Sequence, residues 1–391
     1  MQRFLKNFSI RELLRPLGQM AIFALGSALA LSAIVVVLAL LLDHTAVGAK
    51  VLHDTKVSLV TYALVNLPQV LLDGLTIGFV YAAIALGYTM VYGVLQFINF
   101  AHSEIFATGA FVGIEILIAL KGFGVLDKVS LTMDYVFLLL AMLGGMAAAG
   151  LVAVTVERVA YRPLRAAPRL VPLISAIGVS FFLQDSIRLT ESLTTGQFNR
   201  IFPTFGNFDE RIVFGQLPMG ATSIPLGISN KSLIVIVVAV VMLIALNYFV
   251  NATKTGRAIR AVAQDQATAS LMGVNVNRII STTFLVGGSL GGAAGLLYAL
   301  KFTRIDAFVG FYPGIKAFTA AVLGGIGNLT GALLGGIVLG MLETFAGTYL
   351  SVFTMGAAGT EYKDIFAFAI LILVLIFRPN GLLGENVSQK A

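Results

Sequence analysis

The sequence predicts an all-α membrane protein, a polytopic bundle of about eight to ten transmembrane segments. Of its 391 residues, 58% are hydrophobic and only 12% are charged, which lies outside the range of a soluble globular domain. Apolar runs long enough to cross about 30 Å of hydrocarbon recur along the chain. The basic residues gather in a few of the segments between these runs, as they do in polytopic membrane proteins.

Ten candidate segments account for this fold. Six are uninterrupted apolar runs, at residues 20–42, 74–94, 135–156, 233–250, 279–300 and 364–377, and the last is near the lower length limit. Four are weaker or broken by glycine, at residues 105–120, 170–189, 315–326 and 331–345. Glycines four residues apart, such as Gly287, Gly291 and Gly295, let helix backbones approach closely in a bilayer, so we expect them to serve packing.

Basic residues define the expected orientation. They gather before the first run, after residue 156 and around residues 254–278, and the positive-inside rule places these three segments in the cytoplasm. Residues 190–231 have no such bias and are placed outside. Crossings alternate consistently up to residue 300, and a cytoplasmic tail after Arg378 requires residues 315–326 to cross as a short, buried helix. This placement explains the net charge of +7 without a nucleic-acid partner; membrane lipid is the expected surface contact.

The first 70 residues are expected to form an additional span and an outer linker. A cleaved signal peptide is the alternative, because Val47, Gly48 and Ala49 form a passable cleavage site. The apolar run is longer than the usual about 7–15 residues of a signal peptide, which favours a retained anchor.

Several chemistries are excluded by missing residues. The chain has no cysteine and no H-E-x-x-H motif, so no metal site is expected. It lacks the G-x-x-x-x-G-K-[ST] loop that holds nucleotide phosphates, so ATP and Mg²⁺ would be bound by partner subunits and this chain carries no cofactor. Residues 287–291 match G-x-S-x-G, which makes an intramembrane serine protease pairing Ser289 with His102 a distant alternative. In so glycine-rich a run the match is expected by chance.

A short basic segment between two spans is the first candidate site. In residues 256–273, Ile259, Val262, Ala263, Ala267 and Leu271 fall on one face of a single amphipathic helix, which Gly273 is expected to end. Its cytoplasmic position predicts a docking element for a separate motor protein. We assign this role to Arg257, Arg260, Asp265, Ala269, Leu271 and Gly273.

Two interruptions of the apolar pattern are the second candidate site. One contains Asn99, His102 and Glu104, and the other contains Gly325, Gly327 and Asn328. Polar side chains and irregular backbone at membrane depth need cover by protein or a wet cavity, so these residues are candidates for a substrate pathway. The alternative is that Asn99, His102 and Glu104 lie at the cytoplasmic interface and cap the next helix.

Six motifs carry a resemblance to a known family. They lie at residues 74–78 (GLTIG), 85–93 (ALGYTMVYG), 98–102 (INFAH), 157–165 (ERVAYRPLR), 316–327 (KAFTAAVLGGIG) and 378–384 (RPNGLLG). Together they resemble the H-type permease of high-affinity branched-chain amino-acid ABC transporters over residues 71–384. Residues 385–391 are then a C-terminal tail.

The resemblance implies an ABC importer permease of the bacterial inner membrane, which is not itself an enzyme. Its implied partners are an M-type permease subunit, two ABC ATPase subunits and a periplasmic substrate-binding protein. The implied function is uptake of branched-chain or neutral hydrophobic amino acids by alternating access. A urea or short-chain amide importer is the nearest alternative, because those permeases look similar. A passive channel is disfavoured, because it needs no docking helix.

Two residues depart from the family pattern at the expected docking site. Residues 267–273 resemble the Glu-Ala-Ala-x-x-x-Gly coupling motif of ABC permeases, but Ala267 replaces the glutamate and Thr268 the first alanine. Docking is therefore expected to depend on shape and apolar contact more than on an ion pair. Elsewhere, Ser103 replaces a glycine that is common after the histidine.

Overall fold

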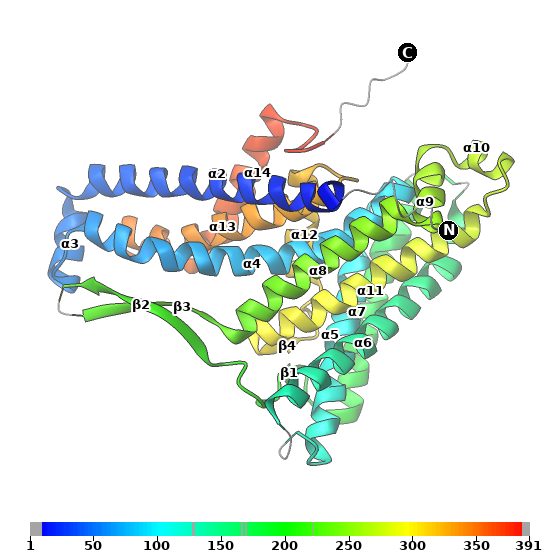
Figure 1. Ribbon diagram of the computed structural model, residues 1–391, viewed down its shortest axis with the longest axis horizontal. Coiled ribbons are helices and arrows are strands. Elements are labelled where there is room, and N and C mark those ends of the chain that lie inside the picture. The colour runs from blue at the N-terminus through cyan, green and yellow to red at the C-terminus, as the bar shows by residue number, and fades with distance from the viewer. Residues whose placement is uncertain (1–9, 127–129, 166, 169, 221, 385–391) are drawn as a thin grey trace.

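The chain folds into a bundle of long helices with short connections (Figure 1). This computed structural model describes residues 10–126, 130–165, 167–168, 170–220 and 222–384. Within those residues, eight helices are long and apolar enough to cross a membrane, which confirms the predicted polytopic helical fold. The helices are α2 (Ile10–Leu42), α3 (Ala46–Thr55), α4 (Leu59–Leu95), α5 (His102–Gly122), α6 (Leu131–Val156), α7 (Leu170–Thr195), α8 (Asn230–Ala252), α9 (Lys254–Gln264), α10 (Gln266–Leu271), α11 (Val276–Phe302), α12 (Phe311–Gly324), α13 (Leu329–Phe353) and α14 (Lys363–Phe377).

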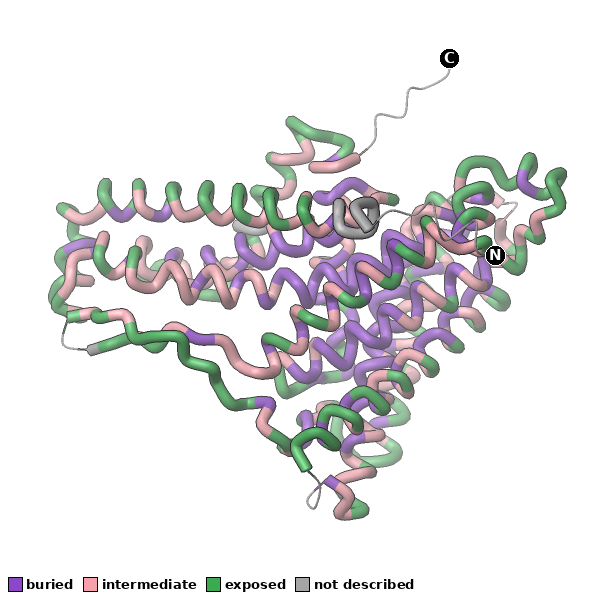
Figure 2. Tube along the Cα trace, viewed as in Figure 1, coloured by how far each residue is buried: buried purple, intermediate pink, exposed green. Residues whose placement is uncertain are grey.

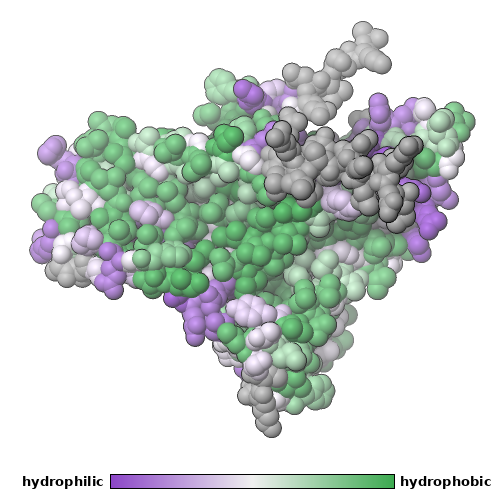
Figure 3. Space-filling model, viewed as in Figure 1, coloured by the Kyte–Doolittle hydropathy of each residue, from purple (hydrophilic) through white to green (hydrophobic). Residues whose placement is uncertain are grey.

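The connections lie at two opposite ends of the bundle. At one end the Gln96 side chain, just after α4, donates to the carbonyl of Ala263 in α9 (3.4 Å). At the other end Lys50 of α3 donates to the carbonyl of Met355 beyond α13 (3.3 Å). The segments around residues 158–165 and 254–278 lie at the first end, here called the basic end; the other is the far end. Figure 3 shows the wide apolar surface between them, as expected for a membrane-spanning bundle.

Helix α13 runs between the two ends, and α12 and α14 are shorter helices that pack along it. Helix α12 has 14 residues and α14 has 15, so they extend about 21 and 22 Å, less than the ~30 Å of the hydrocarbon layer. Helix α12 can be short because α4 and α13 cover it, and most of its residues are buried. Residues 315–326 lie in α12 and the turn after it, but α12 is not among the eight helices that are long enough to cross a membrane in the described residues, so the expected crossing stays a prediction. The chain after Arg378 lies against the end of α12, where the Leu382 amide donates to the carbonyl of Leu323 (2.8 Å).

Glycines set the distance between the central helices α4, α5, α11 and α13, which contain most of the buried residues (Figure 2). A Cβ on Gly78 of α4 would lie 2.6 Å from the Cα of Ile337 in α13. A Cβ on Gly145 of α6 would lie 2.6 Å from the carbonyl oxygen of Gly109 in α5. Both distances are too short for a carbon atom, so these contacts are possible only without a side chain.

The N-terminal part contains a helix where the sequence analysis expected an outer linker. Helix α3 begins after Thr45, whose hydroxyl accepts the Val47 amide hydrogen bond as a helix cap. Ser58 caps α4 by accepting from the Thr61 amide, and the Asp43 carboxylate accepts from the Leu59 amide (2.8 Å) at the same helix start. The expected boundary at residue 71 lies inside α4, so the N-terminal segment and the following body share one continuous helix.

The far end carries short strands, which the helical periodicity could not indicate. Strands β2 (Arg211–Met219) and β3 (Thr222–Ser229) form an antiparallel hairpin, with an irregularity near Gly215. Strands β1 (Asn199–Ile201) and β4 (Arg304–Asp306) pair antiparallel. This second pair ties the connection after α7 to the connection after α11.

We expect Gly78→Leu to destabilise the bundle by about 1–3 kcal/mol, because the new side chain overpacks the contact between α4 and α13. The measurement is the fraction of purified protein that stays monodisperse in size-exclusion chromatography after stepwise heating. Gly93→Leu is the matched control in the same helix, because a Cβ there meets nothing within 4 Å. Equal heat resistance of the two variants would contradict this account of the packing.

Candidate functional site

The candidate docking segment contains two helices instead of the single predicted one. Helix α9 ends at Gln264 and α10 begins at Gln266, with extended backbone at Asp265 between them. The Asp265 carboxylate accepts from the amides of Ala267 (2.8 Å) and Thr268 (3.2 Å), which is the geometry of a helix N-cap. The predicted end of the helix near Gly273 is confirmed, since α10 stops at Leu271 and Gly273 has a φ of +82°.

Helix α9 is fixed to the end of α8. The Arg260 guanidinium donates to the carbonyl of Val250 and to Asn251 Oδ1. The Thr253 hydroxyl accepts from the Gly256 amide (2.9 Å) and caps α9. Ile259 and Val262 are buried against the bundle, while Arg257 is exposed. Among the predicted docking residues, Arg260 therefore fixes the angle between α8 and α9.

The tip of α10 is apolar and projects from the basic end (Figure 1). The Leu271 side chain is 88% exposed and that of Met272 is 81% exposed, whereas Ala269 is buried. The prediction that Ala267 and Leu271 share one helical face with Ile259 is wrong, because the helix is broken at Asp265. Met272 was not among the predicted residues, although two consecutive large apolar side chains before a glycine could have indicated it. We call Leu271 and Met272 the apolar tip.

Hydrogen bonds keep Asp265 charged. Its partner Thr268, through both hydroxyl and backbone amide, lowers the pKa of Asp265 below its usual value of 3.8. A lowered pKa means that the cap is fully present above that usual value and is lost only as the pH falls through the still lower pKa of the folded state. The start of α10 is therefore stable throughout the neutral range.

The polar group at the start of α5 is buried inside the bundle. Asn99 accepts from the Tyr161 hydroxyl (2.7 Å), and Glu104 lies against Gly310. His102 is 1% exposed and lies between Gly87 and Gly291, with the Tyr88 ring edge-on at 4.5 Å between centroids. A Cβ on Gly87 would collide with the imidazole, and a Cβ on Gly291 would make a tight contact with it at 3.2 Å. Asn99, His102 and Glu104 are thus covered by protein, as side chains at membrane depth require.

The second interruption of the apolar pattern, at residues 325–328, is hydrogen-bonded to the C-terminal turn. Gly325 and Gly327 have φ values of +106° and +91°, which glycine adopts at little cost. Asn328 caps α13 by accepting from the Gly331 amide (2.9 Å), and its amide group donates to the carbonyl of Leu383 (3.0 Å). These three predicted residues therefore lie together, with structural roles visible in their contacts.

A cavity of about 230 Å³ lies near this group, among α4, α5, α7 and α12. Aromatic side chains and a few polar groups line it: Tyr88, Phe100, Ser103, Ile177, Ser180, Phe181, Gln184, Phe311, Ile315 and Phe318. None of the six predicted pathway residues is among them, although Ser103 lies between two of them. Gly314 makes room for the Ser103 side chain, because a Cβ there would collide with it. The departure from the family glycine at Ser103 is thus accommodated on α12.

A buried ion-pair network joins the last three helices to α4. Glu343 of α13 lies 3.0 Å from Lys316 of α12 and 2.8 Å from Lys363. Lys316 also pairs with Asp364 of α14 (2.8 Å), and the Tyr81 hydroxyl donates to Glu343 (2.6 Å). Two carboxylates and two ammonium groups balance, so no net charge is buried in these contacts.

The two residues of the protease alternative do not meet. Ser289 lies against Gly150 of α6, where a Cβ would come within 2.5 Å of its hydroxyl. His102 lies on the opposite side of α11, against Gly87 and Gly291. Ser289 therefore packs between helices and is not activated by this histidine.

Comparisons with known proteins agree with this architecture. Residues 70–375 match the family described as branched-chain amino acid transport system / permease component. The chain is 42% identical over 322 residues to the high-affinity branched-chain amino acid transport system permease protein BraD of Pseudomonas aeruginosa, covering 82% of this chain and 97% of that protein. It is 40% identical over 325 residues to the corresponding protein LivH of Escherichia coli K12, with the same coverage.

The multi-pass helical bundle and the match to a permease family together define the class of protein as a membrane transport permease, which has a transport role and not a catalytic one. The chain belongs to the branched-chain amino acid transport system permease family. The family match begins at residue 70, so α2, α3 and the first part of α4 lie outside it.

We expect Asp265→Ala to loosen α10, because two backbone amides lose their acceptor. Hydrogen–deuterium exchange of the peptide covering residues 266–272 should become faster in this variant. Asp265→Asn keeps an acceptor oxygen and should retain most of the protection, and Gln266→Ala is the control for altered sequence in the same turn. In the wild type the protection factor should not change between pH 7 and pH 5. Equal exchange in Asp265→Ala and Gln266→Ala would contradict the capping role.

Proposed function

We propose that this chain is the permease subunit of an ABC importer for branched-chain or neutral hydrophobic amino acids in a bacterial inner membrane. The observation that carries the proposal is the 40–42% identity, over 82% of this chain, to two permeases named for branched-chain amino acid transport. The basic end then faces the cytoplasm by the positive-inside rule. An M-type permease subunit, two ABC ATPase subunits and a periplasmic substrate-binding protein complete the transporter.

The cavity suits an apolar substrate. Phe100, Phe181 and Phe318 provide aromatic surface for an aliphatic side chain, and Ser103 and Gln184 provide hydrogen-bonding groups. Gln184 is buried, so its amide points into the protein and not into solvent. Phe181 is half exposed, so the cavity is open toward a neighbour, and the second permease subunit would complete it.

The apolar tip suits docking of an ATPase subunit. Leu271 and Met272 expose apolar surface on a short helix in the cytoplasm, and covering this surface by a partner would be favourable because it removes the surface from water. ATP and Mg²⁺ bind to the ATPase subunits, and closure of those subunits displaces α10 and α9. Helix α9 packs against α4, α8 and α11, so its displacement reaches helices that surround the polar group at the start of α5. This sequence of contacts supports alternating access.

Reconstitution tests the substrate. Vesicles that contain this chain, its M-type partner, the ATPase subunits and the binding protein should accumulate leucine only when ATP is present. Urea and short-chain amides, offered under the same conditions, should not be transported. Uptake of urea in place of leucine would support the alternative importer, and uptake without the ATPase subunits would indicate a passive channel.

We expect the double variant Leu271→Ala/Met272→Ala to bind the ATPase subunits at least about tenfold more weakly, because it loses the apolar surface that the partner covers. The measurement is co-purification with the ATPase subunits together with substrate-stimulated ATPase activity. The matched control is Gln266→Ala/Ser270→Ala, which changes two exposed polar residues of the same helix. Membrane insertion should be normal in both. Equal ATPase binding by the two double variants would exclude docking through the apolar tip.

A further inference from the structure

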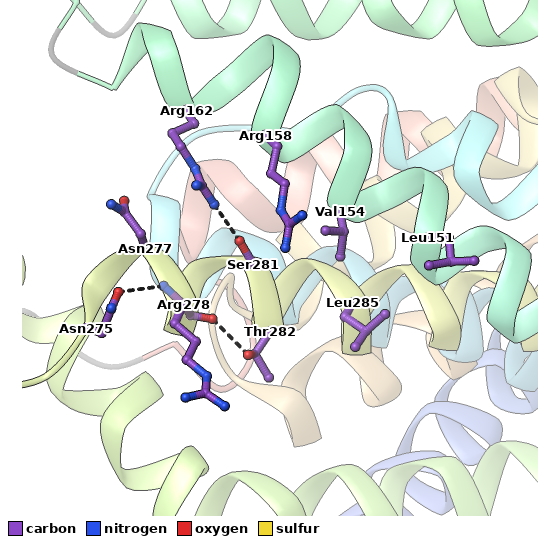
Figure 4. Close-up of a pocket in the computed structure, with 10 residues that line it drawn as sticks. All are labelled: Leu151, Val154, Arg158, Arg162, Asn275, Asn277, Arg278, Ser281, Thr282 and Leu285. Carbon is purple, nitrogen blue, oxygen red and sulfur yellow. Dashed lines mark hydrogen bonds between the residues drawn. The ribbon is translucent and has the colours of Figure 1, made fainter.

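A groove of about 600 Å³ runs between the end of α6 and the start of α11 at the basic end (Figure 4). It lies outside the cavity and the apolar tip described above. Helix α6 continues here into a π-helical turn (Glu157–Tyr161) and a 3-10 turn (Arg162–Leu164). Figure 4 shows Arg158 and Arg162 extending from this segment toward α11.

The groove has two chemically different halves. Arg158, Arg162 and Arg278 line the half nearer the end of the bundle, whereas Leu151 and Leu285 line the half nearer its middle. On each helix the arginine and the leucine are seven residues apart, which is about 10 Å along the axis. The two helices run in opposite directions, so both change from basic to apolar toward the middle of the membrane. Leu151 and Leu285 are exposed, so the apolar half opens onto the hydrophobic surface.

One arginine is fixed in place and two are available to a ligand. Arg162 donates to both carboxylate oxygens of buried Glu157 and to the Ser281 hydroxyl (2.7 Å). Glu157 also pairs with Arg165, so its single negative charge is already shared by two arginines and does not neutralise the others. In the part of the chain that the structure describes, the guanidinium groups of Arg158 and Arg278 have no hydrogen-bond or ion-pair partner. The groove therefore keeps a net positive charge at one end.

We propose that this groove binds an anionic phospholipid of the cytoplasmic leaflet. The phosphate would lie between the Arg158 and Arg278 side chains beside the fixed Arg162, and an acyl chain would lie along Leu151, Val154 and Leu285. A basic site between helices on the cytoplasmic side is typical of acidic headgroup recognition. A soluble anion would use only the basic half, so the apolar half favours a lipid. An arginine that only anchors the helix in the membrane would not need a groove shared with a second helix.

The test compares two lipids that differ in charge. The purified full chain is mixed in detergent with phosphatidylglycerol or phosphatidylcholine of the same acyl chains, and bound lipid is counted by native mass spectrometry. We expect the wild type to retain phosphatidylglycerol preferentially. Arg158→Gln and Arg278→Gln should each weaken that binding by roughly fivefold, with little effect on phosphatidylcholine. Both side chains are exposed and their guanidinium groups unpaired, so the variants should fold normally.

Three controls decide the outcome. Arg378→Gln removes another exposed arginine at the basic end, outside the groove, and should retain wild-type binding. Inorganic phosphate at millimolar concentration should not displace the lipid, whereas displacement would indicate a site for a free anion. The lipid should also remain bound when the chain is assembled with its partner subunits. Loss on assembly, equal binding of the two lipids or an equal loss in Arg378→Gln would overturn the proposal.

Discussion

The architecture depends on the close approach of helix backbones, because no hydrophobic force drives helices together within lipid. In a bilayer, helices associate through packing and buried polar contacts, because the lipid tails are as apolar as the side chains. The glycines of α4 against α13, and of α5 and α6 against α11, allow backbone contact over several turns. This close contact creates the covered interior in which an imidazole, carboxylates and ammonium groups can be placed. Without it, those groups would face lipid.

The buried polar contacts determine the relative positions of the packed helices. Tyr81, Lys316 and Glu343 join α4, α12 and α13 near the far half of the bundle. Tyr161 and Asn99 join the end of α6 to the segment before α5 at the basic end. Each contact is satisfied in only one relative position of the helices, whereas apolar contacts alone tolerate sliding. Polar pairs at both ends thus define the register of the bundle.

Much of the fold could be predicted from the sequence, because the lengths of apolar runs and the positions of basic residues are local properties of the chain. The long apolar helices were predicted from apolar length. The orientation and the short crossing at residues 315–326 depend on the same local signals and stay predictions. The break at Asp265 was also encoded locally, as an acidic residue able to cap a helix, but the amphipathic period continued across it and suggested one helix. The cavity could not be predicted, because its aromatic residues come from three helices and one connection whose neighbours are known only after folding. Asn99, His102 and Glu104 were recognisable as unusual, whereas their burial depends on contacts from distant parts of the chain, such as Gly87 and Gly291 against His102.

The two connections of the docking segment differ in stiffness. Toward α8, Arg260, Thr253 and the tight approach at Gly256 hold a fixed corner. Toward α11, Gly273 adopts a left-handed conformation, and a Cβ there would meet nothing within 4 Å. A displacement of the docking segment would therefore move α8 with it, whereas the backbone at Gly273 can rotate and leave α11 in place. Helix α8 in turn reaches the far end, where Ser232 accepts a hydrogen bond from Lys301 (2.9 Å). The continuous helix α8 thus connects the docking segment at the basic end to the far end of the bundle.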